Sequence, residues 1–105
     1  MTACFDLHSH SLASDGALSP TDLVARAADY GVTHLALTDH DTLRGLDEAR
    51  QAAQARGMTL INGIELSVRH DNREFHVLGL WVDVDDPTLQ ARVSAQNEAR
   101  INRAR

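Results

Sequence analysis

The sequence predicts an α/β fold in which parallel strands are joined by helices. Short apolar segments alternate with longer stretches of helical periodicity, in the order β-α-β-α-β-β-α. Most successive strands are separated by enough chain for the helical crossover that parallel neighbours require. Four strands cannot close a barrel, and a typical α/β barrel needs about 250 residues, whereas this chain has 105. We therefore expect residues 1–105 to form the N-terminal part of one larger domain, without its C-terminal half.

In the first part of the chain, each expected element has a recognisable beginning or end. A first strand covers Cys4 to His8, and Ser14 to Gly16 is typical of a turn. The helix that follows has an N-cap serine (Ser19), a proline at its first position (Pro20) and a glycine after its end (Gly31). Its apolar face comprises Leu23, Val24, Ala27 and Ala28.

The second part repeats this pattern with a less regular ending. A helix capped by Asp41 or Thr42 and followed by Gly57 is expected after the second strand, with Leu43, Leu46, Ala49 and Ala53 on its apolar face. A charged, hairpin-like connection is expected over residues 69–74, and the last helix opens at Asp86-Pro87. The remaining strands are expected over Thr33 to Thr38, Met58 to Ile61 with a continuation after Gly63, and Phe75 to Val82.

The composition excludes several classes of protein. Hydrophobic residues make up 43 % and charged residues 24 % of the chain, which excludes a disordered polymer. The longest run of large apolar residues, Val77 to Val82, is far shorter than the ~20 residues of a membrane span. The N-terminus lacks the basic and apolar regions of a signal peptide, and a single cysteine cannot form an internal disulfide. We expect a cytoplasmic protein without a membrane partner.

Charge is distributed unevenly. The net charge is 10 − 15 = −5, yet the last fourteen residues carry four arginines and one acid. Arg100 and Arg103 lie three residues apart, on one face of the last expected helix. Guanidinium groups suit a phosphate of the substrate, and a solvated helix face is the alternative interpretation.

The first candidate metal-binding motif is Asp6-Leu7-His8-Ser9-His10. Alternate side chains of a strand project to the same face, so His8 and His10 can chelate one ion. The side chain of Asp6 is expected on the same face of the strand, where it could orient a ligand. An isolated His-x-His pair is also compatible with two ordinary surface or core histidines.

Three further segments place polar side chains at or near strand ends, where sites collect in parallel sheets. Asp15, in Ser-Asp-Gly, is a ligand or a turn residue. For His40, in Thr-Asp-His-Asp, we favour metal binding. Glu65 can bridge two ions through its two oxygens or lie on the surface. His76 lies inside an apolar strand, where a lone histidine is more often a core residue, but the joint pattern over four strands favours a metal site.

The other acids and histidines near these motifs are treated separately. For Asp41 we favour helix N-capping, and for Asp39 a ligand role and a structural role both stay open. His34 begins the second strand, at the wrong end for a site, and His70 lies in the charged connection. Neither is included among the candidate ligands.

Four motifs in order, D-L-H-S-H-S-x-x-S-D-G, L-T-D-H-D, G-x-E-L-S and H-x-L-G, resemble the PHP (polymerase and histidinol phosphatase) family. Within it, the chain is similar to bacterial nucleoside-3′,5′-bisphosphate phosphatases, also described as 5′→3′ exoribonucleases. The resemblance implies a distorted, TIM-like (β/α)7 barrel, and it extends over nearly all of the sequence. The implied metal ligands are His8, His10, Asp15, His40, Glu65 and His76. Three further ligands, a histidine and a later Asp-x-His, are implied in a C-terminal half that this sequence does not reach.

The function that follows is metal-dependent hydrolysis of phosphate esters. Two or three divalent ions (Mn²⁺, Zn²⁺ or Fe²⁺) are expected, with a metal-bound hydroxide supported by Asp15, His40 and Glu65 as the attacking group. The expected substrates are 3′,5′-bisphosphonucleotides, another phosphorylated small molecule, or short RNA trimmed from its 5′ end. The alternatives are another PHP phosphatase, such as one for histidinol phosphate, and a non-catalytic metal-binding fragment. Amidohydrolases also carry His-x-His on a first barrel strand, but the later motifs argue against them.

Overall fold

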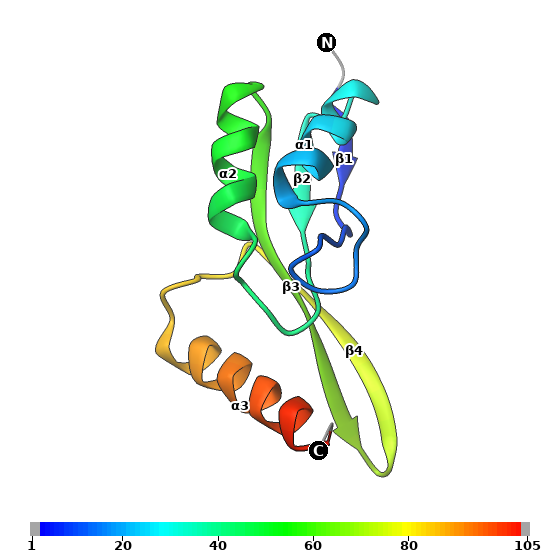
Figure 1. The fold of residues 1–105 in the computed structure, drawn as a ribbon, viewed down its shortest axis with the longest axis vertical. Helices are drawn as coiled ribbons and strands as arrows, with labels where there is room; N and C mark the ends of the chain where they lie inside the picture. The colour runs from blue at the N-terminus through cyan, green and yellow to red at the C-terminus, as the bar shows by residue number, and fades with distance from the viewer. Residues whose placement is uncertain (1–2, 104–105) are drawn as a thin grey trace.

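The computed structural model describes residues 3–103, with the side chains of residues 3–98. Over these residues it contains one sheet, in the order β1-β2-β3-β4, and three helices (Figure 1). The strands are β1 (Phe5–Asp6), β2 (His34–Leu37), β3 (Thr59–His70) and β4 (Arg73–Leu80), and the helices are α1 (Pro20–Asp29), α2 (Leu46–Ala55) and α3 (Pro87–Arg103). The predicted α/β class and the order of elements are confirmed. None of the helices in the described part has the length and apolar character needed to cross a bilayer.

The first three strands are parallel and are joined by α1 and α2, as the sequence predicted. The two helices pack on each other and cover β2 and β3 (Figure 1). Burial of apolar side chains between the helices and the strands is the main stabilising contribution here. The buried members of this core are Val24, Leu35, Leu37, Leu46, Ala49, Ala53 and Met58.

The ends of α1 and β1 are set by side-chain hydrogen bonds to the backbone. Ser19 caps α1 as predicted, because its Oγ accepts a hydrogen bond from the Asp22 amide at 3.1 Å. β1 is shorter than predicted and ends at Asp6. The backbone amide of His8 donates to Asp6 Oδ1 at 3.2 Å, so the chain leaves the sheet before His8.

The hairpin-like connection predicted over residues 69–74 is confirmed, so at this edge of the sheet β4 runs antiparallel to β3 and the expectation of parallel strands holds only for β1 to β3. β3 runs through Gly63 without a break and is joined to β4 by Asp71 and Asn72. Both residues have positive φ (52° and 64°), which is the geometry of a tight hairpin turn. Two residues cannot make a crossover, so the charged connection forces an antiparallel pair.

The predicted beginning of the second helix is wrong. α2 starts at Leu46 with Gly45 as its N-cap, and no side chain caps it. Asp41 is fully buried, has a φ of +53°, and accepts a hydrogen bond from the Ser67 amide of β3 at 2.9 Å. Thr42 Oγ1 accepts from the Arg44 amide instead of capping the helix. A contact with a distant strand therefore overrides the local capping preference.

α3 begins where the sequence predicted. Asp86 Oδ1 accepts hydrogen bonds from the amides of Thr88 and Leu89, at 2.8 and 3.2 Å, beside Pro87. Arg100 and Arg103 belong to this helix, but their side chains lie outside the described residues.

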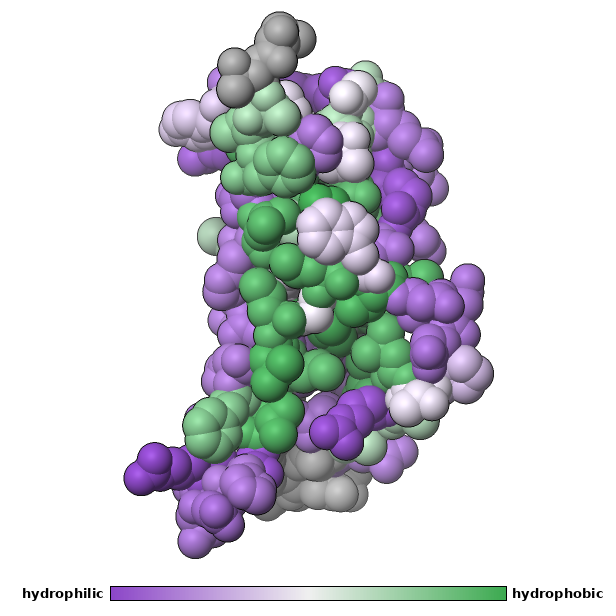
Figure 2. All heavy atoms as spheres, turned by 180° about the vertical axis from the view of Figure 1, so that it is seen from behind, coloured by the Kyte–Doolittle hydropathy of each residue, from purple (hydrophilic) through white to green (hydrophobic). Residues whose placement is uncertain are grey.

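The side of the molecule opposite to the view of Figure 1 carries a broad apolar surface (Figure 2). Large apolar side chains of β1, β4 and the segment after it are exposed; they include Phe5, Phe75, Val77, Leu78 and Trp81. Apolar surfaces of this kind mark places where further polypeptide packs. The sheet therefore has the form of an unclosed portion of a barrel.

The close approach of β3 to β2 yields a test of the packing. A Cβ on Gly63 would lie 2.7 Å from Thr38 Cγ2 and 2.9 Å from the Leu37 carbonyl oxygen. We expect Gly63→Ala to lower the free energy of unfolding by about 1–3 kcal/mol, because the two strands must separate to relieve the clash. Urea denaturation followed by circular dichroism measures the change. Gly31→Ala is the control, because its Cβ would meet nothing within 4 Å, although its φ of +87° adds strain. A smaller loss for Gly63→Ala than for Gly31→Ala would contradict the close approach.

Candidate metal centre

The structure brings all six candidate ligands together at the carboxyl end of the parallel strands. They form three overlapping groups in which the nitrogen and oxygen atoms lie within 4.8 Å of one another. The groups are His8–His10–Glu65, His10–Asp15–His40 and His40–Glu65–His76. Neighbouring imidazole rings are 4.3 to 5.4 Å apart between centroids. The convergence predicted from the sequence is therefore present, although His8 and His10 reach it from the segment after β1 rather than from the strand itself.

Glu65 lies at the centre of the cluster and uses both of its oxygens. Its Oε1 is 2.6 Å from His8 Nε2 and 2.9 Å from His10 Nε2. Its Oε2 is 2.8 Å from His76 Nδ1 and 3.8 Å from His40 Nδ1. The Glu65 side chain is 9 % exposed, and the four groups that approach its carboxylate within 4 Å are all imidazoles.

Burial of Glu65 raises its pKa, but the surrounding imidazoles lower it more. Hydrogen bonds with His76, His8 and His10 and the nearby charge of His40 bring the pKa from the ordinary value of 4.5 to about 2. Glu65 is therefore an anion at neutral pH, which is the form that binds a cation.

Asp15 is the second carboxylate of the cluster, and it lies on a surface loop. Its Oδ1 is 2.9 Å from His10 Nδ1, and its Oδ2 is 3.1 Å from His40 Nε2. The loop folds back closely at Gly16, where a Cβ would lie 2.2 Å from the His10 carbonyl oxygen. The glycine of Ser-Asp-Gly is therefore required for Asp15 to approach His10.

His40 is held by backbone pairing on both sides. The Asp41 amide donates to the Glu65 carbonyl oxygen, and the Glu65 amide donates to the Asp39 carbonyl oxygen, each at 3.0 Å. This isolated parallel bridge lies three residues beyond the last β2–β3 pair, Leu37 with Asn62, and keeps the same register. His40 and Glu65 thereby lie side by side as a consequence of main-chain geometry.

The role of Asp39, which the sequence left open, is structural. Asp39 is buried; its Oδ1 accepts from the Ser11 amide at 2.6 Å and from Ser14 Oγ at 2.8 Å, and its Oδ2 accepts from Ser11 Oγ at 2.7 Å. Asp6, which we expected to orient a ligand, accepts a hydrogen bond from the backbone amide of His8. Sequence reasoning missed Ser11, whose position between two motifs was the available signal.

His34 and His70 lie outside the cluster, as predicted. His34 stacks on Phe5 at a centroid distance of 4.2 Å, at the opposite end of β2. His70 lies 3.3 Å from Asp71 at the exposed hairpin turn.

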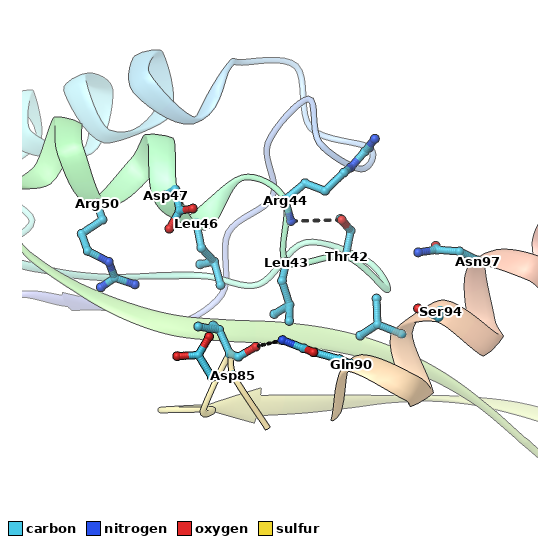
Figure 3. A pocket seen from close by; sticks show the side chains of 12 residues that line it. Thr42, Leu43, Arg44, Leu46, Asp47, Arg50, Asp85, Gln90, Ser94 and Asn97 are labelled. Carbon is cyan, nitrogen blue, oxygen red and sulfur yellow. Dashed lines mark hydrogen bonds between the residues drawn. The ribbon is translucent and has the colours of Figure 1, made fainter. Parts of the chain in front are cut away.

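A separate pocket between α2 and α3 is lined by none of the six cluster residues, and Figure 3 shows Arg44 pointing away from it.

The donor set fits divalent ions of the first transition series. Four imidazoles and two carboxylates are ligands for which Mn²⁺, Fe²⁺ and Zn²⁺ are all suitable. The two Glu65 oxygens face different pairs of histidines, so this carboxylate could serve two neighbouring ions. A half-barrel sheet that gathers such donors at its carboxyl edge defines an α/β domain with a candidate metal centre.

Residues 6–100 match the PHP domain, and the chain belongs to this family. The chain is 49 % identical over 104 residues to a 5′-3′ exoribonuclease of Haemophilus influenzae, covering 99 % of this chain and 38 % of that protein. It is 47 % identical over 103 residues to a 3′,5′-nucleoside bisphosphate phosphatase of Chromobacterium violaceum, covering 98 % and 36 %. The resemblance drawn from the motifs is thereby confirmed.

Solved structures share the fold. A Chromobacterium violaceum protein described as an amidohydrolase, with bound sulfate and no metal, has a TM-score of 0.92 and 46 % identity over 97 % of this chain and 36 % of that one. A candidate metal-dependent phosphoesterase from Bifidobacterium adolescentis has a TM-score of 0.90 and 30 % identity over 99 % and 36 %. The chain spans little more than a third of the length of these relatives.

The environment of Glu65 predicts its titration in the metal-free chain. We expect a pKa of about 2, and the stabilisation from the ionised carboxylate is present above pH 4.5 and lost as the pH falls toward 2. Carbon-13 NMR of the side-chain carboxyl groups, recorded with a chelator, follows the titration. His76→Ala should raise the pKa because it removes a hydrogen bond to Oε2, whereas His70→Ala should leave it unchanged. A Glu65 midpoint at or above pH 4.5 would contradict the hydrogen bonding described here.

Proposed function

We propose that the chain provides the N-terminal part of a single PHP catalytic domain that hydrolyses phosphate esters with the help of divalent ions. The observation that carries the proposal is the convergence of four imidazoles and two carboxylates at the carboxyl edge of the sheet. The names of the curated relatives, an exoribonuclease and a bisphosphate phosphatase, both describe cleavage of phosphate esters.

Each group of ligands would hold one ion, with Glu65 bridging two of the positions. His8 and His10 would complete one position, and His40 and His76 another, while Asp15 would serve the third with His10 and His40. Further ligands from polypeptide beyond residue 105 would complete the coordination of each ion, as the family resemblance implies.

The ligands of this chain have separate tasks in the reaction. Bound divalent ions would lower the pKa of a water molecule and would neutralise negative charge on the phosphoryl oxygens. Glu65, ionised at neutral pH, keeps the histidines oriented with their nitrogens toward the centre. Asp15, whose side chain is 62 % exposed, would with its neighbour His40 hold the ion nearest the phosphoryl group of a substrate. The scheme needs no covalent attack by a side chain of the protein, so Ser9, Ser11 and Cys4 have no such role in it.

A nucleotide with a second phosphate, or the 5′ end of an RNA, is the substrate class that we propose. The bisphosphate phosphatase and the exoribonuclease are named for such substrates. The sulfate in the structure of the Chromobacterium violaceum protein is a tetrahedral oxyanion, as phosphate is. Arg100 and Arg103 of α3 are proposed to bind the phosphate that is not cleaved.

Hydrolysis can be tested in the chain and in a chimera in which it replaces the matching N-terminal segment of the Chromobacterium violaceum relative. The substrates are 3′-phosphoadenosine 5′-phosphate, a short 5′-phosphorylated RNA and histidinol phosphate, each with Mn²⁺, Zn²⁺ or Fe²⁺. We expect the chimera to cleave the first two in preference to the third. Preference for histidinol phosphate would favour the alternative phosphatase. A folded chimera that binds ions without cleaving any of the three would favour a non-catalytic metal-binding module.

Two cluster residues should be essential in this assay. We expect His8→Ala and Glu65→Ala to reduce hydrolysis by at least about 10²-fold, because each removes a ligand from a group that needs all of its donors. A chelator should abolish activity, and added Mn²⁺ should restore it. His70→Ala is the matched control, since it removes an exposed histidine outside the cluster. Full activity of either cluster variant would refute the proposed centre.

The arginines of α3 predict a separate effect on substrate binding. We expect Arg100→Ala in the chimera to raise KM for the 3′,5′-bisphosphate by about tenfold with little change in kcat, because a charge-assisted hydrogen bond to the uncleaved phosphate is lost. A mononucleotide that lacks the second phosphate is the control substrate, and its KM should not change. An unchanged KM for the bisphosphate would remove this arginine from the substrate site.

A further inference from the structure

The loop of residues 11–18, hereafter the Asp15 loop, delivers one carboxylate to the cluster from an exposed position. The Asp15 side chain is 62 % exposed, and its contacts are with His10 and His40. The loop is closed by backbone hydrogen bonds from Leu12 to Leu18, and from Ser14 and Gly16 to Ser11, at 2.8 to 3.0 Å. These bonds fix the shape of the loop, but they do not fix its position relative to His40.

That position depends on Asp39. Its buried carboxylate accepts hydrogen bonds from the amide and the hydroxyl of Ser11 and from the hydroxyl of Ser14. Ser14 directly precedes Asp15, and Asp39 directly precedes His40, so the hydrogen bond between them joins the two chain segments beside their cluster residues. The other side-chain tether is weaker, because Arg44 is exposed and donates to the Ala13 carbonyl oxygen at 2.9 Å.

We propose that Asp39 is a positioning residue for one of the three metal positions, because it holds the Asp15 loop so that Asp15 meets His10 and His40. The inference rests on the proposed function, since it assumes that ions bind the cluster. It assigns to Asp39 and Ser14 a task that involves no contact with the ion.

The effect should be confined to that position. Glu65 is fixed by the β3–β4 ladder and by the backbone bridge to His40, and neither depends on the Asp15 loop. The groups His8–His10–Glu65 and His40–Glu65–His76 therefore keep their geometry when Ser14 loses its hydroxyl. Residues that hold a ligand in place typically change metal affinity by about 10- to 100-fold.

Titration of the full chain with Co²⁺ tests this inference without an activity assay. Visible absorption reports the geometry of each bound ion, and calorimetry gives the number and affinity of the ions. In Ser14→Ala, we expect one class of Co²⁺ site to weaken by about 10- to 100-fold while the other sites keep their affinity and spectrum. Ser14→Thr, which retains a hydroxyl, should bind as the unaltered chain does. Ser94→Ala, which removes a hydroxyl from α3, is the matched control.

A second variant probes the anchor itself. Asp39→Asn keeps the size of the side chain but leaves one acceptor oxygen where three hydrogen bonds are received. Asp39→Asn should weaken the same class of Co²⁺ site as Ser14→Ala does. If Asp39→Asn does not fold, the result for Ser14→Ala decides whether Asp39 has the positioning role. Unchanged Co²⁺ binding in Ser14→Ala, or equal weakening of every site, would overturn the positioning role while leaving the proposed metal centre intact. Failure of Co²⁺ to bind both the unaltered chain and the chimera, which carries the polypeptide that follows in the relative, would overturn both proposals.

Discussion

The candidate centre depends on one constraint, which is that a buried carboxylate must be paired on both of its oxygens. An unpaired Glu65 would be strongly destabilising in its position inside the sheet, and the imidazoles around it remove that penalty. The constraint fixes the register of the sheet, because a slip of one residue would turn Glu65 to the opposite face. The backbone bridge between His40 and Glu65 holds this register at the edge of the cluster.

The antiparallel hairpin completes the set of partners for Glu65. β3 continues past the end of its pairing with β2, and the turn at Asp71 and Asn72 returns the chain alongside it. His76 therefore comes back to the same carboxylate after eleven residues, from the strand next to Glu65. A parallel continuation would have placed the next strand beyond a helical crossover. The edge strand that breaks the parallel pattern is thus the one that supplies the fourth imidazole.

The sequence was sufficient to predict the members of the cluster but not all of the structure that holds them. Ser19 and Pro20 specify the start of α1 locally, and the prediction there was correct. The local sequence around Asp41 also favours an N-cap. Its carboxylate instead accepts a hydrogen bond from the Ser67 amide, which lies 26 residues away in the chain. The end of β1 at Asp6 and the direction of β4 likewise follow from particular hydrogen bonds and from a two-residue turn. Periodicity detects which segments are strands, but it does not contain these pairings.

The Thr-Asp-His-Asp segment shows how neighbouring acids can have opposite relations to a metal centre. His40 faces the cluster, while the Asp39 carboxylate accepts hydrogen bonds from the Asp15 loop and the Asp41 carboxylate accepts one from the Ser67 amide of β3. The charge of the centre depends on this separation. Among the described residues, Glu65 and Asp15 are the carboxylates of the cluster. Divalent ions held there would carry more positive charge than these two carboxylates carry negative charge, and an excess of that sign attracts an anion such as a phosphate ester. Two more carboxylates at the centre would reduce that excess, so the burial of Asp39 and Asp41 elsewhere would favour the anionic substrate that we propose.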